Sequence, residues 1–316
     1  MLYLPFSGLS LPFSGFISLF PGSIHNSPFD IFRENCSILS PSEFGRSTRT
    51  EGEFFMVPKT KQALENYRPD NPDRPSGERW VTMSNALVRA GHGLTLAEKR
   101  IVMCAVSKLD SRTALKPGEL PRTKITASEY AEIASCKMNA AYEALQEATK
   151  TLFNRKITFY EPPTSQRSRS ANHAIRTEMR WVGRCRYHAG EGWVELVWWP
   201  DLLPSLIGLK KQFTTYQLQQ AHALRSVYSW RLLELLTRYK STGWAEYTVE
   251  NFAASMNATE KQQTDFGKIR TKIIEPAVKE LTEKDNWEIQ WRPIKAGRRV
   301  SKIRFDFKKN DQGKLF

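Results

Sequence analysis

The sequence has few cysteines, and they are not arranged to hold a metal ion or a disulfide framework. The 316 residues include only Cys36, Cys104, Cys136 and Cys185, and no two of them form a CxxC pair. Zinc sites and disulfide frameworks both need cysteines at short, recurring spacings. We therefore expect no metal, and the widely spaced cysteines are typical of a protein of the reducing cytoplasm.

The motifs of nucleotide-dependent and metal-dependent enzymes are also missing. There is no GxxxxGK[ST] segment, which argues against a P-loop ATPase, and no HExxH segment. No two of the five histidines stand two residues apart, as the metal of a rolling-circle nickase would require. His222 and Arg225 match the HxxR pattern of tyrosine recombinases, but two residues at a fixed spacing recur by chance, and the start of a helix explains the segment. We expect a protein that needs no cofactor and is not an enzyme.

The first residues lack charge altogether. Residues 1–29 carry none, and Leu-Pro-Phe-Ser-Gly occurs twice, at 4–8 and 11–15. A signal peptide would begin with basic residues, and a membrane span would need about 20 apolar residues without repeated proline and glycine. We interpret 1–55 as a non-structural leader from an upstream start codon, with Met56 as the alternative initiator. Residues 1–79 together read as non-globular leader and linker.

The rest of the chain is strongly basic. The formal net charge is +14 and the isoelectric point is about 9.6. Residues 1–55 balance to −2, so the chain from Met56 onward carries 44 basic and 28 acidic residues, a net charge of +16. A surplus of this size repels itself in the folded state unless a polyanion binds. Nucleic acid is the first candidate partner, and an anionic membrane surface is the second.

The spacing of apolar residues predicts three helices followed by strands. The first helix covers 94–109, and Thr95 with Glu98 can form a capping box at its start. A short helix and a longer helix follow, and then three segments that alternate like strands, at 125–134, 137–153, 156–160, 181–187 and 193–199. Helix, short helix, longer helix and hairpin is the order of a winged helix-turn-helix.

The same order returns in the second half. The predicted elements are a helix, a short helix, a longer helix and two strands joined by a basic loop, at 228–239, 247–253, 265–283, 287–291, 300–307 and 292–299. At an offset of 122 residues, Thr248 and Phe252 match Thr126 and Tyr130. We predict an α+β fold of two tandem winged-helix domains, a pseudo-repeat, with a non-globular N-terminal extension. The domains are placed at 80–205 and 206–310, with a tail at 311–316.

The longer helix of the second domain has the polar, cationic face that entry into the major groove requires. At about 100° per residue, its polar residues fall opposite the buried stripe of Phe266, Ile273 and Ala277. Pro276 should kink the helix or mark its restart, so the first two turns are the predicted reading portion. The predicted DNA contacts on this helix are Lys268, Arg270, Thr271, Lys272 and Lys279.

The lysines of this helix have two interpretations: a face that contacts DNA, or an ordinary helix face in contact with solvent. A basic loop next to the helix decides between them. A second basic element beside the helix favours a surface that follows the DNA backbone. Its predicted contacts are Lys295, Arg298, Arg299, Lys302 and Arg304.

The first domain differs from the second in its charges. The outward face of its longer helix carries Glu143, Gln146, Glu147 and Lys150, which suits phosphates poorly. We expect this domain to contact the DNA backbone or the minor groove and to supply a protein–protein surface. Its predicted DNA contacts stand in one loop: Arg167, Arg169, Arg176 and Arg180.

Three segments resemble the iteron-binding plasmid replication initiators of the RepB/RepE type. They are 84–87, 224–236 and 266–281, of which Ile-Glu-Pro-Ala-Val at 274–278 is the most specific. The resemblance covers about 80–310 and does not extend to 1–55, which fits the interpretation of a leader.

The resemblance implies a function. Such initiators bind double-stranded DNA at tandem iterons as monomers, promote melting of an AT-rich segment and recruit host replisome proteins such as a helicase or an initiator. As homodimers in equilibrium with monomers they bind an operator and repress their own gene. The first domain then holds the dimer interface, and residues 268–272 of the second read bases. A winged-helix transcriptional repressor without an initiator role remains an alternative, and a DNA strand-transfer enzyme is a third hypothesis. None of these involves a membrane.

Overall fold

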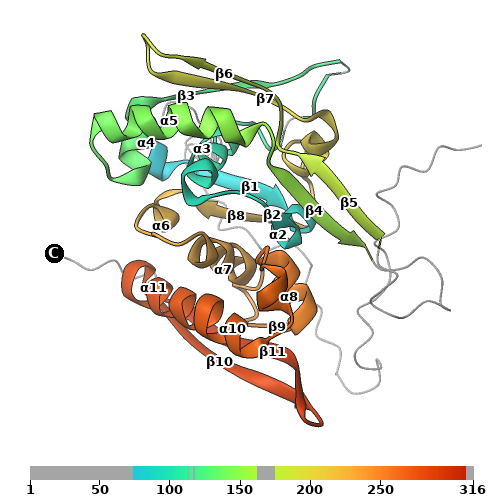
Figure 1. The fold of residues 1–316 in the computed structure, drawn as a ribbon. Helices are drawn as coiled ribbons and strands as arrows, with labels where there is room; N and C mark the ends of the chain where they lie inside the picture. Colours follow the sequence, from blue (N-terminus) through green and yellow to red (C-terminus); the bar gives the residue numbers. More distant parts are fainter. Residues whose placement is uncertain (1–73, 113, 117, 162–174, 311–316) are drawn as a thin grey trace, which may run out of the picture. The chain divides into compact units, whose positions relative to one another are not determined.

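The computed structural model describes residues 74–112, 114–116, 118–161 and 175–310, and the predicted helices and strands of both repeats lie within them (Figure 1). The predicted leader at 1–55, the alternative start at Met56 and the tail at 311–316 lie outside these residues.

The first repeat joins three helices to an antiparallel sheet. Strand β3 pairs with β7, and β7 pairs with β6, so the sheet order is β3-β7-β6. This arrangement is a winged helix, and the β6–β7 hairpin is its wing. In chain order the elements are α3 (Leu96–Val106), β3 (Arg122–Thr126), α4 (Ala127–Ala134), α5 (Met138–Leu152), β6 (Val182–His188) and β7 (Trp193–Trp198).

The second repeat has the same topology. Strand β9 pairs with β11 as β3 pairs with β7, and the sheet order is β10-β11-β9. The α+β fold of two tandem winged helices is therefore confirmed. In chain order the elements are α7 (Val227–Thr237), β9 (Trp244–Thr248), α8 (Val249–Ser255), α9 (Glu260–Gln263), α10 (Phe266–Ile269), η4 (Arg270–Ile274), α11 (Glu275–Asp285), β10 (Trp287–Ala296) and β11 (Arg299–Lys309).

The offset of 122 residues holds in three dimensions. Strands β3 and β9 begin 122 residues apart, and so do α4 and α8. Thr126 and Thr248 cap these helices, because each hydroxyl accepts a bond from the amide three residues later. Tyr130 and Phe252 are both buried. The predicted capping box of Thr95 and Glu98 is also present, at the start of α3.

A strand pair connects the beginning of the first repeat to the segment that leads into the second. Strand β1 (Trp80–Ser84) pairs with β8 (Phe213–Gln217), and the hydroxyls of Thr82 and Thr215 lie 3.0 Å apart. Strand β8 follows residue 205, where we placed the end of the first domain. The domain limits stay a prediction. The other short elements are η1 (Ser76–Glu78), α2 (Asn85–Arg89), η3 (Pro200–Ser205) and α6 (Gln219–His222).

The described part of one predicted loop is a strand. Strand β5 (Ile175–Arg180) pairs with β4 (Lys156–Glu161), and β2 (Gly91–His92) pairs with the other side of β4. Arg176 and Arg180 therefore lie on a strand and not in a loop, and the β4–β5 hairpin precedes the wing. Both faces of β5 are partly exposed, so its side chains lack the alternation that identifies a half-buried strand.

Candidate nucleic-acid interface

The helix that runs from Phe266 to Asp285 turns a cationic face outward. Asp265 caps its start, with the carboxylate 2.9 Å from the amide of Gly267. The buried face consists of Ile269, Ile273, Ile274, Ala277 and Leu281. The residues predicted to contact DNA are all exposed: Lys268, Arg270, Thr271, Lys272 and Lys279. Their placement on the surface agrees with the prediction, and their role in DNA binding stays a prediction.

Pro276 changes the hydrogen bonding of this helix, as the sequence predicts. Residues 270–274 form a π-helical turn, in which the amide of Glu275 donates to the carbonyl of Arg270, five residues earlier. Proline has no amide hydrogen to continue the α-helical pattern, and the chain restarts as α11 with Pro276 in its first turn. The wider turn buries the adjacent residues Ile273 and Ile274 together.

Acidic neighbours accompany most cations of this helix. Lys268 lies 3.4 Å from Asp265, and Arg270 lies 2.7 Å from Glu275. Lys268 lowers the pKa of the exposed Asp265 carboxyl. Exposed ion pairs contribute little, so phosphates can displace them. Lys272 has no ion-pair partner among the described residues, which leaves its ammonium group available to an anion.

The wing of the second repeat returns along the same helix. Asn286 (φ 54°) ends α11 in the left-handed conformation, and β10 begins at the next residue. The hairpin therefore runs back toward α10 and ends in a tight turn at Gly297 (φ 63°) and Arg298 (Figure 1). The basic loop predicted at 292–299 is thus mostly strand, because the ladder extends to the pair Ala296–Arg299.

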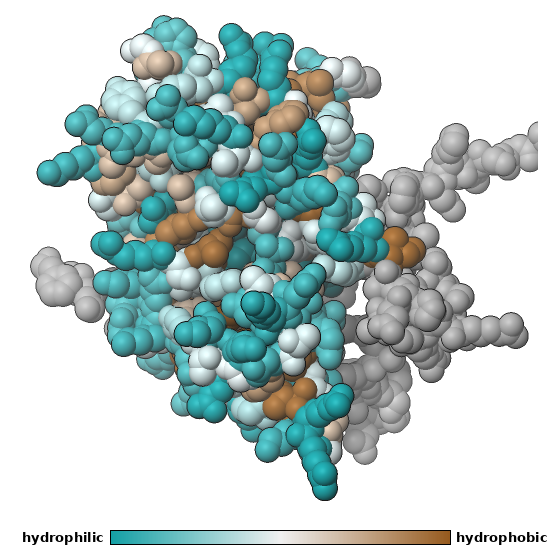
Figure 2. Space-filling view, in the orientation of Figure 1, coloured by the Kyte–Doolittle hydropathy of each residue, from teal (hydrophilic) through white to brown (hydrophobic). Residues whose placement is uncertain are grey.

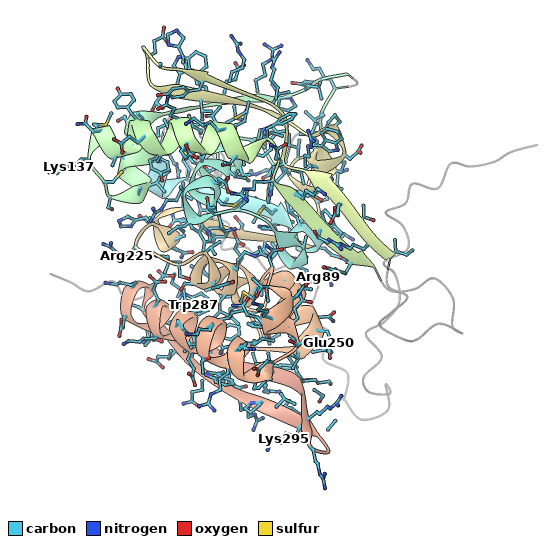
Figure 3. The ribbon with its side chains drawn as sticks, viewed as in Figure 1. Arg89, Lys137, Arg225, Glu250, Trp287 and Lys295 are labelled. Atoms are coloured by element: carbon cyan, nitrogen blue, oxygen red, sulfur yellow. The ribbon has the colours of Figure 1, made fainter. Side chains whose placement is uncertain are left out.

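The predicted wing contacts divide into two groups. Lys295, Arg298 and Arg299 are exposed around the tip and have no ion-pair partner among the described residues. Figure 2 shows hydrophilic side chains covering this tip, and Figure 3 shows Lys295 beside it. Such groups can approach phosphates without first leaving a carboxylate.

Lys302 and Arg304 lie farther from the tip and already have protein partners. Lys302 is 2.9 Å from Glu246. The guanidinium of Arg304 is 2.8 Å from Asp306 and 4.3 Å from the ring centroid of Trp244. The Asp306 carboxylate raises the pKa of Arg304. A phosphate that binds Lys302 or Arg304 must therefore replace contacts that these side chains already make within the protein.

Of the four cations predicted for the first repeat, the two that the structure describes do not lie at its wing. Arg167 and Arg169 lie outside the described residues. Arg176 pairs with Glu178, and the guanidinium of Arg180 lies 4.5 Å from the ring centroid of Phe153. By topology the wing is the β6–β7 hairpin, so Arg176 and Arg180 belong to a different hairpin.

The first repeat also has a basic sheet face that was not predicted from the sequence. Arg122 and Arg184 flank Val197 in the strand register, and both are exposed. Lys124 and Arg186 flank Glu195 one step along, and Arg186 pairs with that glutamate at 3.3 Å. The signal was the spacing of two between the cations within each strand, which places them on one face.

The helix α5 of the first repeat shows the acidic outward face that the sequence predicts. Glu143, Gln146, Glu147 and Lys150 are all exposed, and Lys150 pairs with Glu147 at 3.1 Å. The HxxR residues have a structural explanation too. His222 ends α6, and the backbone amide of Arg225 donates to Glu280 at 2.7 Å.

Comparison with known proteins decides the family. The model "Initiator Replication protein, WH1" matches residues 80–237, half of the chain, and "Initiator Rep protein, WH2" matches 248–307. The chain belongs to the family of replication initiator proteins. The predicted resemblance is confirmed. The first family model extends through α7, which we assigned to the second repeat, and the second begins at the last residue of β9.

Two relatives from Escherichia coli are similar to this initiator. An uncharacterized 27.6 kDa protein is 26% identical over 213 residues, which cover 65% of this chain and 85% of that protein. The PI protein is 25% identical over 241 residues, which cover 68% of this chain and 77% of that protein. A crystal structure of the Pi initiator protein in complex with iteron DNA has the same fold. Its TM-score is 0.60 at 21% identity, with 74% of this chain and 99% of that chain covered.

Within the described part of the chain, every helix is too short or too polar to cross a bilayer.

Proposed function

We propose that this chain is a plasmid replication initiator that binds direct repeats, or iterons, in double-stranded DNA at a replication origin. The observation that carries the proposal is the cationic face of the 266–285 helix, with the unpaired cations of the wing tip beside it, in a chain of the initiator family. The Pi initiator, which has this fold, was crystallised with iteron DNA.

The two winged helices take different roles in this proposal. In the second, Lys268, Arg270, Thr271 and Lys272 read base edges in the major groove, since a helix there presents its polar side chains to the bases. Lys279 and the wing residues contact phosphates. The first winged helix contacts the DNA backbone. It also provides the surface for a homodimer, a role that the acidic face of α5 supports.

The remaining steps follow from the family resemblance. As a monomer the protein binds iterons in the cytoplasm, helps to melt the neighbouring AT-rich DNA and recruits a host helicase or initiator. As a dimer it binds an operator and represses its own gene. The charge distribution supports DNA binding, and the proposal includes no catalytic step.

Footprinting on DNA of the same replicon tests the proposal. We expect protection of several direct repeats on one helical face, at intervals of about 20 bp, or two helical turns. Binding should weaken steeply as salt is raised, because each phosphate contact releases a counterion. A variant with Lys150→Ala on the acidic face of α5 serves as a control, with unchanged protection.

Other footprints would support other functions. A single palindromic site, in a protein that the replicon can lose and still replicate, would indicate a winged-helix repressor and overturn the initiator role. A covalent adduct between a tyrosine and DNA would indicate strand transfer.

A further inference from the structure

One guanidinium group joins the ends of two helices from different repeats. Arg231 on α7 is 1% exposed. Its Nη2 donates to the carbonyls of Val88 and Ala90, at the end of α2, both at 2.7 Å. The same nitrogen donates at 2.9 Å to the carbonyl of Ser255, the last residue of α8, and Nε donates to it at 3.1 Å. The last carbonyls of a helix have no partner within it, and a cation there is favoured by the helix dipole.

A buried carboxylate and an imidazole hold the same guanidinium from its other side. Glu234 accepts from Nη1 of Arg231 at 2.6 Å and from Nζ of Lys99 at 3.0 Å. With its Nε2 donating to a backbone carbonyl at 2.8 Å, His92 turns Nδ1 toward Nη1 of Arg231 at 3.2 Å. Burial, Arg231 and Lys99 lower the pKa of His92, so the ring is neutral and its Nδ1 can accept a hydrogen bond from Arg231. Glu234 and His92 therefore hold the side of the guanidinium that does not meet the carbonyls of α2 and α8.

Two further contacts bring α8 against the first repeat. The hydroxyl of Ser255 donates to the carbonyl of Arg89 at 2.7 Å, and Figure 3 shows Arg89 beside α8. Gly91 faces the carbonyl of Ala254 so closely that a Cβ there would stand 3.0 Å from the oxygen. Both contacts depend on α8 keeping one position.

We infer that Arg231 is a positioning residue, which fixes α8, and with it the second winged helix, on the first. Only the planar fork of arginine offers five donors in a fixed geometry, whereas lysine offers three on one flexible point charge. Helix α8 precedes the reading helix, so its position sets how far that helix is rotated from the first repeat. The inference rests on the proposed function, in which both repeats meet one duplex.

The spacing of the DNA contacts tests this inference in the full-length protein. The probe is an iteron duplex. It is compared with duplexes that have two base pairs inserted between the DNA segment protected by the first winged helix and the segment protected by the second. Two base pairs turn the duplex by about 70°. We expect the wild type to lose affinity on the order of tenfold on this insertion. For Arg231→Met and Arg231→Lys we expect weaker binding to the native duplex and a difference between duplexes below about threefold.

A distance measurement without DNA gives a second readout. Spin labels attached through Lys150→Cys on α5 and Glu250→Cys on α8, with the native cysteines replaced, report on the two repeats. We expect one narrow distance distribution in the wild type and a broad one in Arg231→Met. Arg79→Met is the matched control, because Arg79 is also nearly buried but pairs with Glu129 inside the first repeat. It should keep the narrow distribution and the spacing dependence.

A second variant keeps the test decisive if the arginine variants do not fold. Gly91→Ala leaves Arg231 in place and adds a methyl group against Ala254, so it should move α8 and broaden the distribution. Folded variants with a narrow distribution and a wild-type dependence on spacing would overturn the inference. If the wild-type protein protects no direct repeats in the origin DNA, the proposed function fails. The distance measurement, which uses no DNA, still decides the role of Arg231.

Discussion

The ring of Tyr142 on α5 lies against Gly192 at the wing turn of the first repeat, so closely that a Cβ at Gly192 would stand 1.9 Å from Cε1. Gly192 also has φ 62°, a conformation that side chains rarely adopt. The glycine thus lets the wing turn pack on the helix.

Gly192→Ala should destabilise the protein by more than the backbone conformation alone costs, which is about 1–2 kcal/mol. The ring of Tyr142 must move, and its packing is lost. The free energy of unfolding from urea titration measures the effect. Gly118→Ala is the control, because Gly118 has φ 78° and nothing within 4 Å of the added methyl. If the free energy of unfolding falls by the same amount in both variants, the contact with Tyr142 does not contribute to stability.

Lys272→Ala should weaken iteron binding by about 1–3 kcal/mol if Lys272 reads a base, and should lower the salt dependence by about one ion if it contacts a phosphate. Lys272 is exposed and has no acidic partner among the described residues. Titration by fluorescence anisotropy at several salt concentrations distinguishes the two. Lys150→Ala, which removes a lysine paired with Glu147, should leave affinity unchanged. Equal losses in both variants would contradict the assignment of the reading helix.

The two groups of wing cations should behave differently on substitution. Arg299→Ala removes an unpaired charge at the tip, and we expect the slope of log K against log salt to fall by about 0.9. Arg304→Ala breaks contacts with Asp306 and Trp244, so we expect a loss of stability and a smaller change in slope. Thermal melting and salt titration of both variants measure the two quantities. A larger change in slope for Arg304→Ala would reverse the assignment.

The buried His92 should make the protein less stable below about pH 6.5. Its pKa is lowered by burial, by Arg231 and by Lys99, so the unfolded chain binds a proton that the folded chain excludes. The free energy of unfolding should therefore fall as the pH drops from 6.5 to 5, by at most about 1.4 kcal/mol per pH unit. Glu234, the acidic neighbour of those cations, has a lowered pKa and titrates below this window. Burial lowers the pKa of Lys99 only to about 8, above it.

His92→Gln should flatten this pH dependence, as urea titrations between pH 5 and 7.5 can show. His222→Gln, at an exposed histidine, is the control and should keep the wild-type slope. A slope that is unchanged in His92→Gln would show that another group titrates.

Local patterns allowed the fold to be predicted where the patterns were strong. The stripes of α3, α7 and α11 and the caps at Thr126 and Thr248 depend on residues within a few positions of each other, so they are visible in the sequence. Strand β5 was missed because neither of its faces is fully buried. The length of β10 was underestimated because the cations of the wing look like a loop until their pairing partners are known.

The candidate site likewise has a part that the sequence predicts and a part that it does not. The exposed side of the 266–285 helix follows from helical periodicity, and Lys268 and Lys272 were found by it. The basic face formed by Arg122, Lys124, Arg184 and Arg186 needs the register of three strands, two of them about 60 residues from the third. Strand register at that separation is set by tertiary packing, which no local pattern encodes.

The sequence by itself determined that this chain is basic, that it repeats a winged helix and that the second copy carries the cationic helix. Charge and periodicity are properties of the residues in order, so folding does not alter them. Only the tertiary structure decided which cations are available at the wing tip and which are held by carboxylates. It alone showed that Arg231, a charged residue on the mostly apolar helix α7, meets the ends of α2 and α8. Those carbonyls come from residues 88, 90 and 255, and only the packing of the core brings them to one guanidinium.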